Sequence, residues 1–202
     1  MTTARAAVLR ARHAGPWREA TRHPFLDGVR TGALSAGALD AWLVQDHLFV
    51  GDLLAYQARL LARAPRAAQE VLASGLGALV AELGWFEQLA GERGLDLGAG
   101  PQPVTLAYRD LLDDLEGEPV GVALLALWAL ERAYLEAWSS AAPGSGPYRA
   151  FVEHWTTPEF GAYVAALEVA ADSAARPGEE PRAEAAFLRV VRLERDFWPV
   201  AP

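Results

Sequence analysis

Apolar residues recur at steps of three and four along nearly the whole of this 202-residue chain. In one segment the repeating positions are Leu39, Trp42, Phe49, Leu53 and Leu60. Such steps keep side chains on one face of a helix, whereas a strand changes face at every residue. Alanine and leucine, which favour helices, fill the chain, and β-branched residues are sparse. The sequence therefore predicts an all-α helical bundle.

Proline, glycine and capping residues mark where these helices begin and end. The expected helices span residues 4–22, 36–63, 66–93, 104–115, 119–141, 148–155, 158–175 and 182–198. No helix is expected between residues 23 and 35, and residues 94–103 and 143–147 read as loops because glycine and proline gather there. No linker divides the pattern, so one domain over residues 1–202 is expected.

Composition excludes several classes of protein. The net charge is −8 with no basic stretch, which argues against a nucleic-acid partner. The chain has no cysteine and no lysine, which removes disulfides, thiolate chemistry and Schiff-base chemistry. Residues 1–12 lack the continuous apolar region of a signal peptide, and the longest apolar run, residues 120–130, is about half a membrane span. A cytoplasmic protein that does not contact the membrane is expected.

Three carboxylates occupy places in the apolar stripes where another apolar residue would fit. Asp46, Glu131 and Glu194 lie on three different expected helices, each at helical spacing from apolar neighbours. All three are therefore predicted to point inward. A buried carboxylate without a partner becomes neutral through a raised pKa or costs stability. One such acid is explained by pairing with an arginine, whereas three on separate helices predict a shared polar pocket.

Aromatic residues accompany these acids. The chain has seven tryptophans, among them Trp42 near Asp46, Trp138 near Glu131 and Trp198 beside Glu194. Large rings commonly fill helical cores, and that explanation stands for most of them. Together with the acids, they also predict a flat slot in which a planar heterocycle stacks while the carboxylates accept its hydrogen bonds.

The histidines do not predict a metal site. A di-iron bundle needs Glu-x-x-His pairs, and none of the four histidines has an acid three residues before it. His47 follows Asp46 by one residue, which turns it about 100° away from the face of that acid, so it is not expected to be catalytic. No metal and no cofactor are expected.

Five short motifs resemble one known family in their order and spacing across nearly the whole chain. They are His23-Pro24-Phe25-Leu26, Trp42-Leu43-Val44-Gln45-Asp46, residues 103–108, Glu159-Phe160 and Glu194-Arg195-Asp196-Phe197-Trp198. Together they look like the TenA/thiaminase II family, whose members hydrolyse thiamin or degraded aminopyrimidines to supply the pyrimidine half of thiamin. The resemblance implies a single-domain haem-oxygenase-like bundle, a homo-oligomer (tetramer or dimer), and a small planar pyrimidine as the ligand.

The resemblance also implies roles for individual residues. By position, Asp46 resembles the aspartate that binds the pyrimidine's amino group and ring nitrogen, Tyr108 a tyrosine near the reacting carbon, and Glu194 the acid–base glutamate. One branch of the family carries a nucleophilic cysteine on the helix expected at residues 119–141. This chain has Glu131 there instead, and resembles the cysteine-less, glutamate-type branch. The implied site is catalytic Glu194 and Glu131, with Asp46, Tyr108, Phe49, Trp42, Tyr134 and Trp155 binding the substrate.

Some features leave alternatives open. Phe49 and Trp155 stand where tyrosines are common in the cysteine branch, so thiamin itself is a doubtful substrate. Glu82 falls between two possible stripes and faces either the core or solvent. The preferred function is a thiamin-salvage hydrolase that cleaves a C–N bond of an aminopyrimidine or formylaminopyrimidine. The alternatives are a non-catalytic pyrimidine-binding or regulatory protein, and an oxidase like the pyrroloquinoline-quinone synthesis protein.

Overall fold

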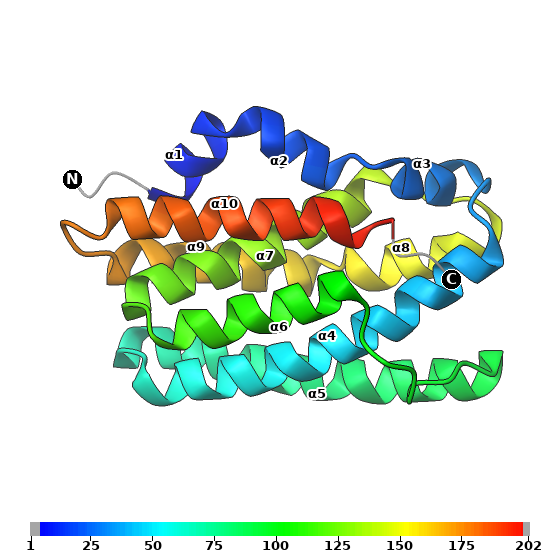
Figure 1. Ribbon diagram of the computed structural model, residues 1–202, viewed down its shortest axis with the longest axis horizontal. Coiled ribbons are helices and arrows are strands. Elements are labelled where there is room, and N and C mark those ends of the chain that lie inside the picture. The colour runs from blue at the N-terminus through cyan, green and yellow to red at the C-terminus, as the bar shows by residue number, and fades with distance from the viewer. Residues whose placement is uncertain (1–4, 200–202) are drawn as a thin grey trace.

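The computed structural model describes residues 5–199 (Figure 1). This part of the chain contains ten α-helices and one short 3-10 helix, joined by loops. The helices are α1 (Arg5–Arg12), α2 (Ala14–Thr21), α3 (Pro24–Thr31), α4 (Ala36–Arg63), α5 (Arg66–Arg93), α6 (Pro103–Glu116), α7 (Val120–Ser140), η1 (Gly146–Tyr148), α8 (Arg149–Trp155), α9 (Pro158–Ala174) and α10 (Glu180–Phe197). This part of the chain contains no strand, so the predicted all-α class is confirmed. The ends of the expected domain, and Ala4 as the first helix's expected start, lie outside the described residues.

The long helices have the expected bounds because their termini carry strong local signals. The Ser35 side chain accepts a hydrogen bond from the Ala38 backbone N–H, which caps the start of α4. Gly94 ends α5 in the left-handed conformation, with φ of 68°. That conformation suits glycine because it has no Cβ to clash.

Two expectations about the N-terminal region are wrong. The single helix expected over residues 4–22 is two helices, α1 and α2, separated at His13. Pro16 lies in the first turn of α2, and because it has no backbone N–H it cannot bond to the Arg12 carbonyl and continue α1. The two helices can therefore diverge, with α1 packing on α9 and α2 on α10 and α7.

The second correction is α3, which lies where no helix was expected. The His23 side chain accepts a hydrogen bond from the Phe25 backbone N–H, Pro24 occupies the first turn, and Gly32 ends the helix with φ of 82°. These are ordinary start and stop signals for a helix. The segment is short, and its burial of Phe25 and Val29 depends on the finished bundle.

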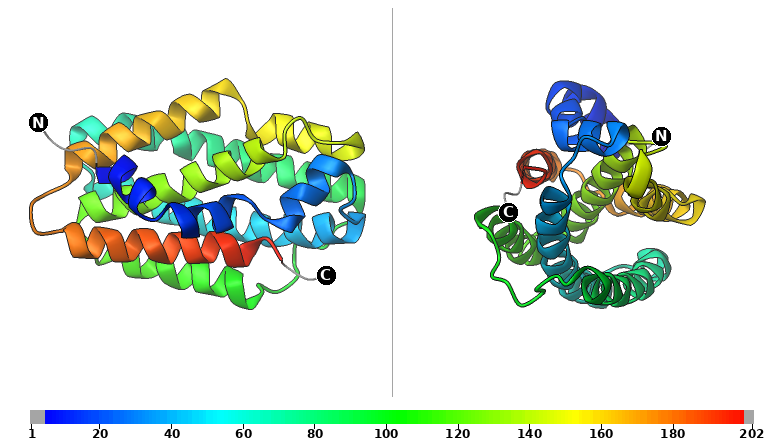
Figure 2. Two further views of the ribbon diagram at one scale, coloured as in Figure 1. Left: turned by 90° about the horizontal axis from the view of Figure 1, so that it is seen from above. Right: turned by 90° about the vertical axis from the view of Figure 1, so that its right-hand side faces the viewer.

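Helix α7 is the centre of the bundle and is buried nearly all round, as its continuous apolar run from Val120 requires. It packs most extensively on α9 and α10, and also on α2 and α4. Figure 1 shows α1–α3 along one edge and α4–α6 along the opposite edge, with α7, α9 and α10 between them. Figure 2 shows the same arrangement end-on. No helix among the described residues is long and apolar enough to cross a membrane.

Candidate functional site

The three acids singled out in the sequence all lie inside the bundle. Asp46 comes from α4, Glu131 from α7 and Glu194 from α10, and their exposed fractions are 2%, 7% and 6%. The inward orientation predicted from helical spacing is confirmed. Their charges also act on one another, because those of Glu131 and Glu194 both raise the pKa of Asp46. The folded chain therefore brings together three carboxylates that are far apart in the sequence.

No arginine within residues 5–199 forms an ion pair with Asp46, Glu131 or Glu194. The Tyr134 hydroxyl donates a hydrogen bond to Asp46 Oδ2 at 3.1 Å, and the Tyr108 hydroxyl donates to Glu194 Oε1. The Glu131 carboxyl group forms no hydrogen bond and no ion pair with any other described residue. Core ion pairing with arginine, the simplest structural explanation of buried acids, is therefore wrong for all three.

The electrostatic state of the acids follows from this environment. Burial raises the pKa of Glu194 to about 8, although the Tyr108 hydrogen bond opposes the rise. Burial also raises the pKa of Glu131 to about 8, and the charges of Glu194 and Glu82 contribute. The pKa of Asp46 is raised well above its usual range by burial first and by the charge of Glu82 second. These are carboxylic acids that can hold a proton at neutral pH.

Aromatic side chains pack around the acids, as the sequence predicted. The Trp42 ring lies 6.3 Å from Tyr134 and 5.5 Å from Trp155, centroid to centroid. On the Glu194 side, the Phe49 ring lies 4.7 Å from Tyr108. All eight candidate residues are thus found in one region of the bundle. It has the aromatic and acidic character that suits a planar ligand with hydrogen-bond donors.

Glu82 of α5 belongs to the same region, which the sequence left open. Its carboxylate accepts hydrogen bonds from Trp155 Nε1 and His154 Nε2, each at 2.8 Å. Its charge raises the pKa of Asp46, Glu131 and Tyr134. The spacing of Glu82 between Leu79 and Phe86 was the available signal, but an equally good stripe through Leu83 competed with it. His47 instead meets Phe86 edge-on, at 6.0 Å between ring centroids.

Gln45, the neighbour of Asp46, has a supporting role that the sequence did not reveal. It is buried, and its Oε1 accepts hydrogen bonds from the Gln102 backbone N–H at 2.8 Å and from the Thr105 hydroxyl at 2.6 Å. Its Nε2 donates to the Gly100 carbonyl oxygen at 3.2 Å. These bonds tie the start of α6 to α4, and α6 carries Tyr108. Gln45 therefore positions the helix that holds the partner of Glu194.

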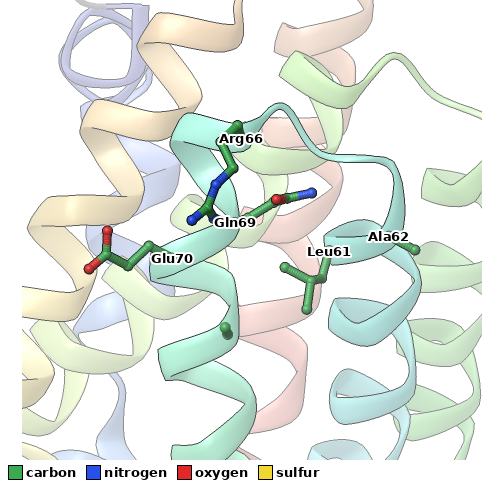
Figure 3. Close-up of a pocket in the computed structure, with 6 residues that line it drawn as sticks. Leu61, Ala62, Arg66, Gln69 and Glu70 are labelled. Atoms are coloured by element: carbon green, nitrogen blue, oxygen red, sulfur yellow. The ribbon is translucent and has the colours of Figure 1, made fainter.

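The site is distinct from the open hollow drawn in Figure 3. That hollow lies at the turn between α4 and α5, with Leu61, Arg66 and Glu70 around it, and no candidate residue belongs to it. Within residues 5–199, no group of three histidine or acidic side chains is arranged to hold a metal ion. The carboxyl groups gathered at the site can transfer protons, and the aromatic rings can bind a ligand.

Comparisons with known proteins agree with this architecture. A family model described as the TENA/THI-4/PQQC family matches residues 10–201. A relative from Glycine max, named "Probable bifunctional TENA-E protein", is 30% identical over 194 residues, which span 89% of this chain and 85% of the relative. A solved TenA homologue from Pyrococcus furiosus is 28% identical with a TM-score of 0.92, covering 98% of this chain and 100% of its own.

A more distant solved structure, from a Silicibacter species, is described as a TenA family transcription regulator. It is 20% identical with a TM-score of 0.88, and the match covers 97% of this chain and 96% of that one. At this level of identity the likeness shows a shared fold alone.

Proposed function

Because the chain belongs to the TENA/THI-4/PQQC family, we propose that it is a thiamin-salvage hydrolase. Its substrate would be an aminopyrimidine or formylaminopyrimidine breakdown product of thiamin, cleaved at a C–N bond. The observation that carries this proposal is the set of buried carboxylates from α4, α7 and α10, which have no arginine partner and are surrounded by aromatic rings. The name TENA-E of the Glycine max relative agrees with the cysteine-less branch that this chain resembles.

Each of the three acids would have a different role in this reaction. Hydrolysis joins the oxygen of water to carbon, breaks the C–N bond, and leaves the released nitrogen with an added proton. Asp46 would hold the amino group and ring nitrogen of the pyrimidine by paired hydrogen bonds, which are strongest when the ring is protonated. Glu194 would give the proton to the leaving nitrogen, and Glu131 would act as the base for water.

The raised pKa values fit these roles when the ligand is a cation. At neutral pH a carboxyl group with a pKa of about 8 is mostly protonated, so Glu194 has a proton to give. Glu131 must first lose its own proton. A protonated pyrimidine or ammonium group placed beside Glu131 lowers the pKa of that acid, because an opposite charge favours the carboxylate, and the released proton passes to solvent. Substrate binding would thereby switch Glu131 from acid to base.

The two alternative functions are less well supported. A polyacidic ligand such as a pyrroloquinoline-quinone precursor would meet four acidic side chains, Asp46, Glu82, Glu131 and Glu194, and no arginine is paired to the three buried ones to receive its carboxylates. A non-catalytic binding protein gains some support from Phe49 and Trp155, which lack the hydroxyl groups of the cysteine branch. Such a protein has no need for carboxyl groups poised near neutral pH, which are costly to bury.

The decisive experiment compares the natural chain with Glu194→Gln. Purified protein is expected to release ammonia from an aminomethylpyrimidine or formate from its formylamino counterpart. Glu194→Gln should lower kcat by at least about 100-fold, the usual contribution of a general acid, while pyrimidine binding measured by calorimetry persists. The matched control is Asp196→Asn, which changes an exposed carboxylate on the same helix and should retain turnover. Binding of these pyrimidines by the natural chain without any release would favour the binding-protein alternative.

A further inference from the structure

Glu82 is held by two ring nitrogens from adjacent residues of α8. Trp155 Nε1 donates to Glu82 Oε1, while His154 Nε2 lies 2.8 Å from Glu82 Oε2. Each carboxylate oxygen therefore has its own partner, which fixes both the position and the orientation of the group. Neighbouring helix residues point about 100° apart, so both rings must turn toward Glu82 to reach it.

A second contact fixes the imidazole ring itself. Trp85 of α5 lies one helical turn beyond Glu82, and its ring stacks on that of His154 with centroids 4.1 Å apart and planes 13° apart. Trp85 also meets Trp155 edge-on at 5.5 Å. These four residues form a brace between α5 and α8, whereas the main packing partners of α5 are α4 and α9.

We propose that His154 is a positioning residue of the hydrolase site, which clamps the Glu82 carboxylate on the side of the site that holds Asp46 and Tyr134. This inference rests on the proposed function only for its effect on turnover, because the clamp itself is a property of the folded protein. His154 would not contact the substrate. It would act through Glu82, whose charge faces the acids that perform the chemistry.

The clamp matters because the Glu82 side chain could otherwise turn toward solvent. Its side chain is 21% exposed, so without His154 it can turn toward water. The titratable groups that interact with it are Asp46 on α4, Glu131 and Tyr134 on α7, and His154 on α8. The charge of Glu82 raises the pKa of Asp46 and Glu131, whereas burial raises that of Glu194.

Loss of the clamp therefore has a predictable direction. If Glu82 turns outward, its negative charge moves away from Asp46 and Glu131, and their pKa falls. Asp46 and Glu131 then titrate at lower pH.

The test compares His154→Leu, which removes the donor, with His154→Gln, which retains an amide N–H in a similar place. The pH profile of kcat/KM for pyrimidine hydrolysis is expected to shift to lower pH by roughly half to one unit in His154→Leu. It should return toward the natural profile in His154→Gln. The matched control is Glu153→Gln, which removes an exposed charge from the same helix and should leave the profile in place.

A second measurement keeps the inference separate from the proposed function. Carbon-13 NMR of labelled carboxyl groups reports the acid pKa values without any turnover. The highest carboxyl pKa values should fall in His154→Leu and recover in His154→Gln. Unchanged carboxyl pKa values in a folded His154→Leu protein overturn the positioning role, even if hydrolysis is found. A fall in the pKa values without hydrolysis in the natural chain retains the clamp and rejects the hydrolase.

Discussion

At the scale of single residues, the molecule concentrates destabilising groups in one place. The Glu131 carboxyl group is buried without a hydrogen bond or ion pair to any other described residue, and that of Glu194 is bonded only to the Tyr108 hydroxyl. Burying such groups lowers the stability of the folded chain, and carboxyl groups of this kind are typical of functional sites. Glu184, by contrast, lies at the surface, where the His13 and Arg12 contacts lower its pKa. The buried acids and Glu184 thus have pKa values shifted in opposite directions.

The buried acids predict an unusual dependence of stability on pH. The pKa of Glu131 is about 8 in the folded chain against an ordinary value of 4.5, so the folded state binds the proton more tightly than the unfolded state. The contribution of Glu131 to stability is therefore complete below about pH 4.5 and is lost as the pH rises through 8. In Glu131→Gln, the loss of unfolding free energy between pH 5 and pH 8.5 should be smaller by on the order of 2–4 kcal/mol.

Urea unfolding at the two pH values measures this difference within each protein. The glutamine amide of the variant can change the free energy of unfolding by the same amount at both pH values. That change cancels, because each protein serves as its own reference. Glu184→Gln is the control, since its side chain is half-buried at the surface and its pKa is lowered rather than raised. An equal pH dependence in the natural chain and Glu131→Gln would show that Glu131 is charged at neutral pH.

At the scale of elements, the sequence predicts the ends of a helix where a capping residue or a glycine marks them. Ser35 and Gly94 bound the two 28-residue helices at the expected places. The failures came where a short segment depends on its surroundings. Helix α3 is only 8 residues long, too short to be stable without the bundle. The break at His13 follows from Pro16 together with the separate packing of α1 and α2.

Two helical glycines test how tightly the elements pack. A Cβ at Gly121 would lie 2.7 Å from the Ala174 carbonyl oxygen, a backbone atom that cannot move aside easily. A Cβ at Gly77 would have nothing within 4 Å. Gly121→Ala should therefore destabilise the chain by about 1–3 kcal/mol, whereas Gly77→Ala should stabilise it by about 0.5–1 kcal/mol. Thermal unfolding of the two variants measures both signs, and equal effects would reject the close approach of α7 to α9.

At the scale of the whole molecule, the site exists only because the bundle closes. Its carboxyl groups come from α4, α5, α7 and α10, and the aromatic and hydroxyl groups around them also come from α6 and α8. All seven tryptophans are buried or half-buried. The large exposed apolar residues of the described chain are valines and a leucine, including Val80 on α5 and Val169 on α9.

The homo-oligomer expected from the family resemblance stays a prediction. Light scattering coupled to gel filtration should give a mass that is two or four times 21.7 kDa. Because α5 and α9 pack side by side, Val80 and Val169 are the natural residues to test as parts of the subunit contact. The double variant Val80→Asp, Val169→Asp should reduce the mass toward that of one chain. A single-chain mass for the natural protein would contradict the expectation.

The sequence by itself determined the fold class, the long helices and the inward direction of Asp46, Glu131 and Glu194. Helical periodicity is a local property, and a residue's face follows from its spacing to its neighbours. Only the tertiary structure decided that the acids lack arginine partners, that Glu82 joins them, and that His154 holds it. Those facts depend on which helices meet, and on which side chain of one helix reaches which of another, and no local spacing carries that information.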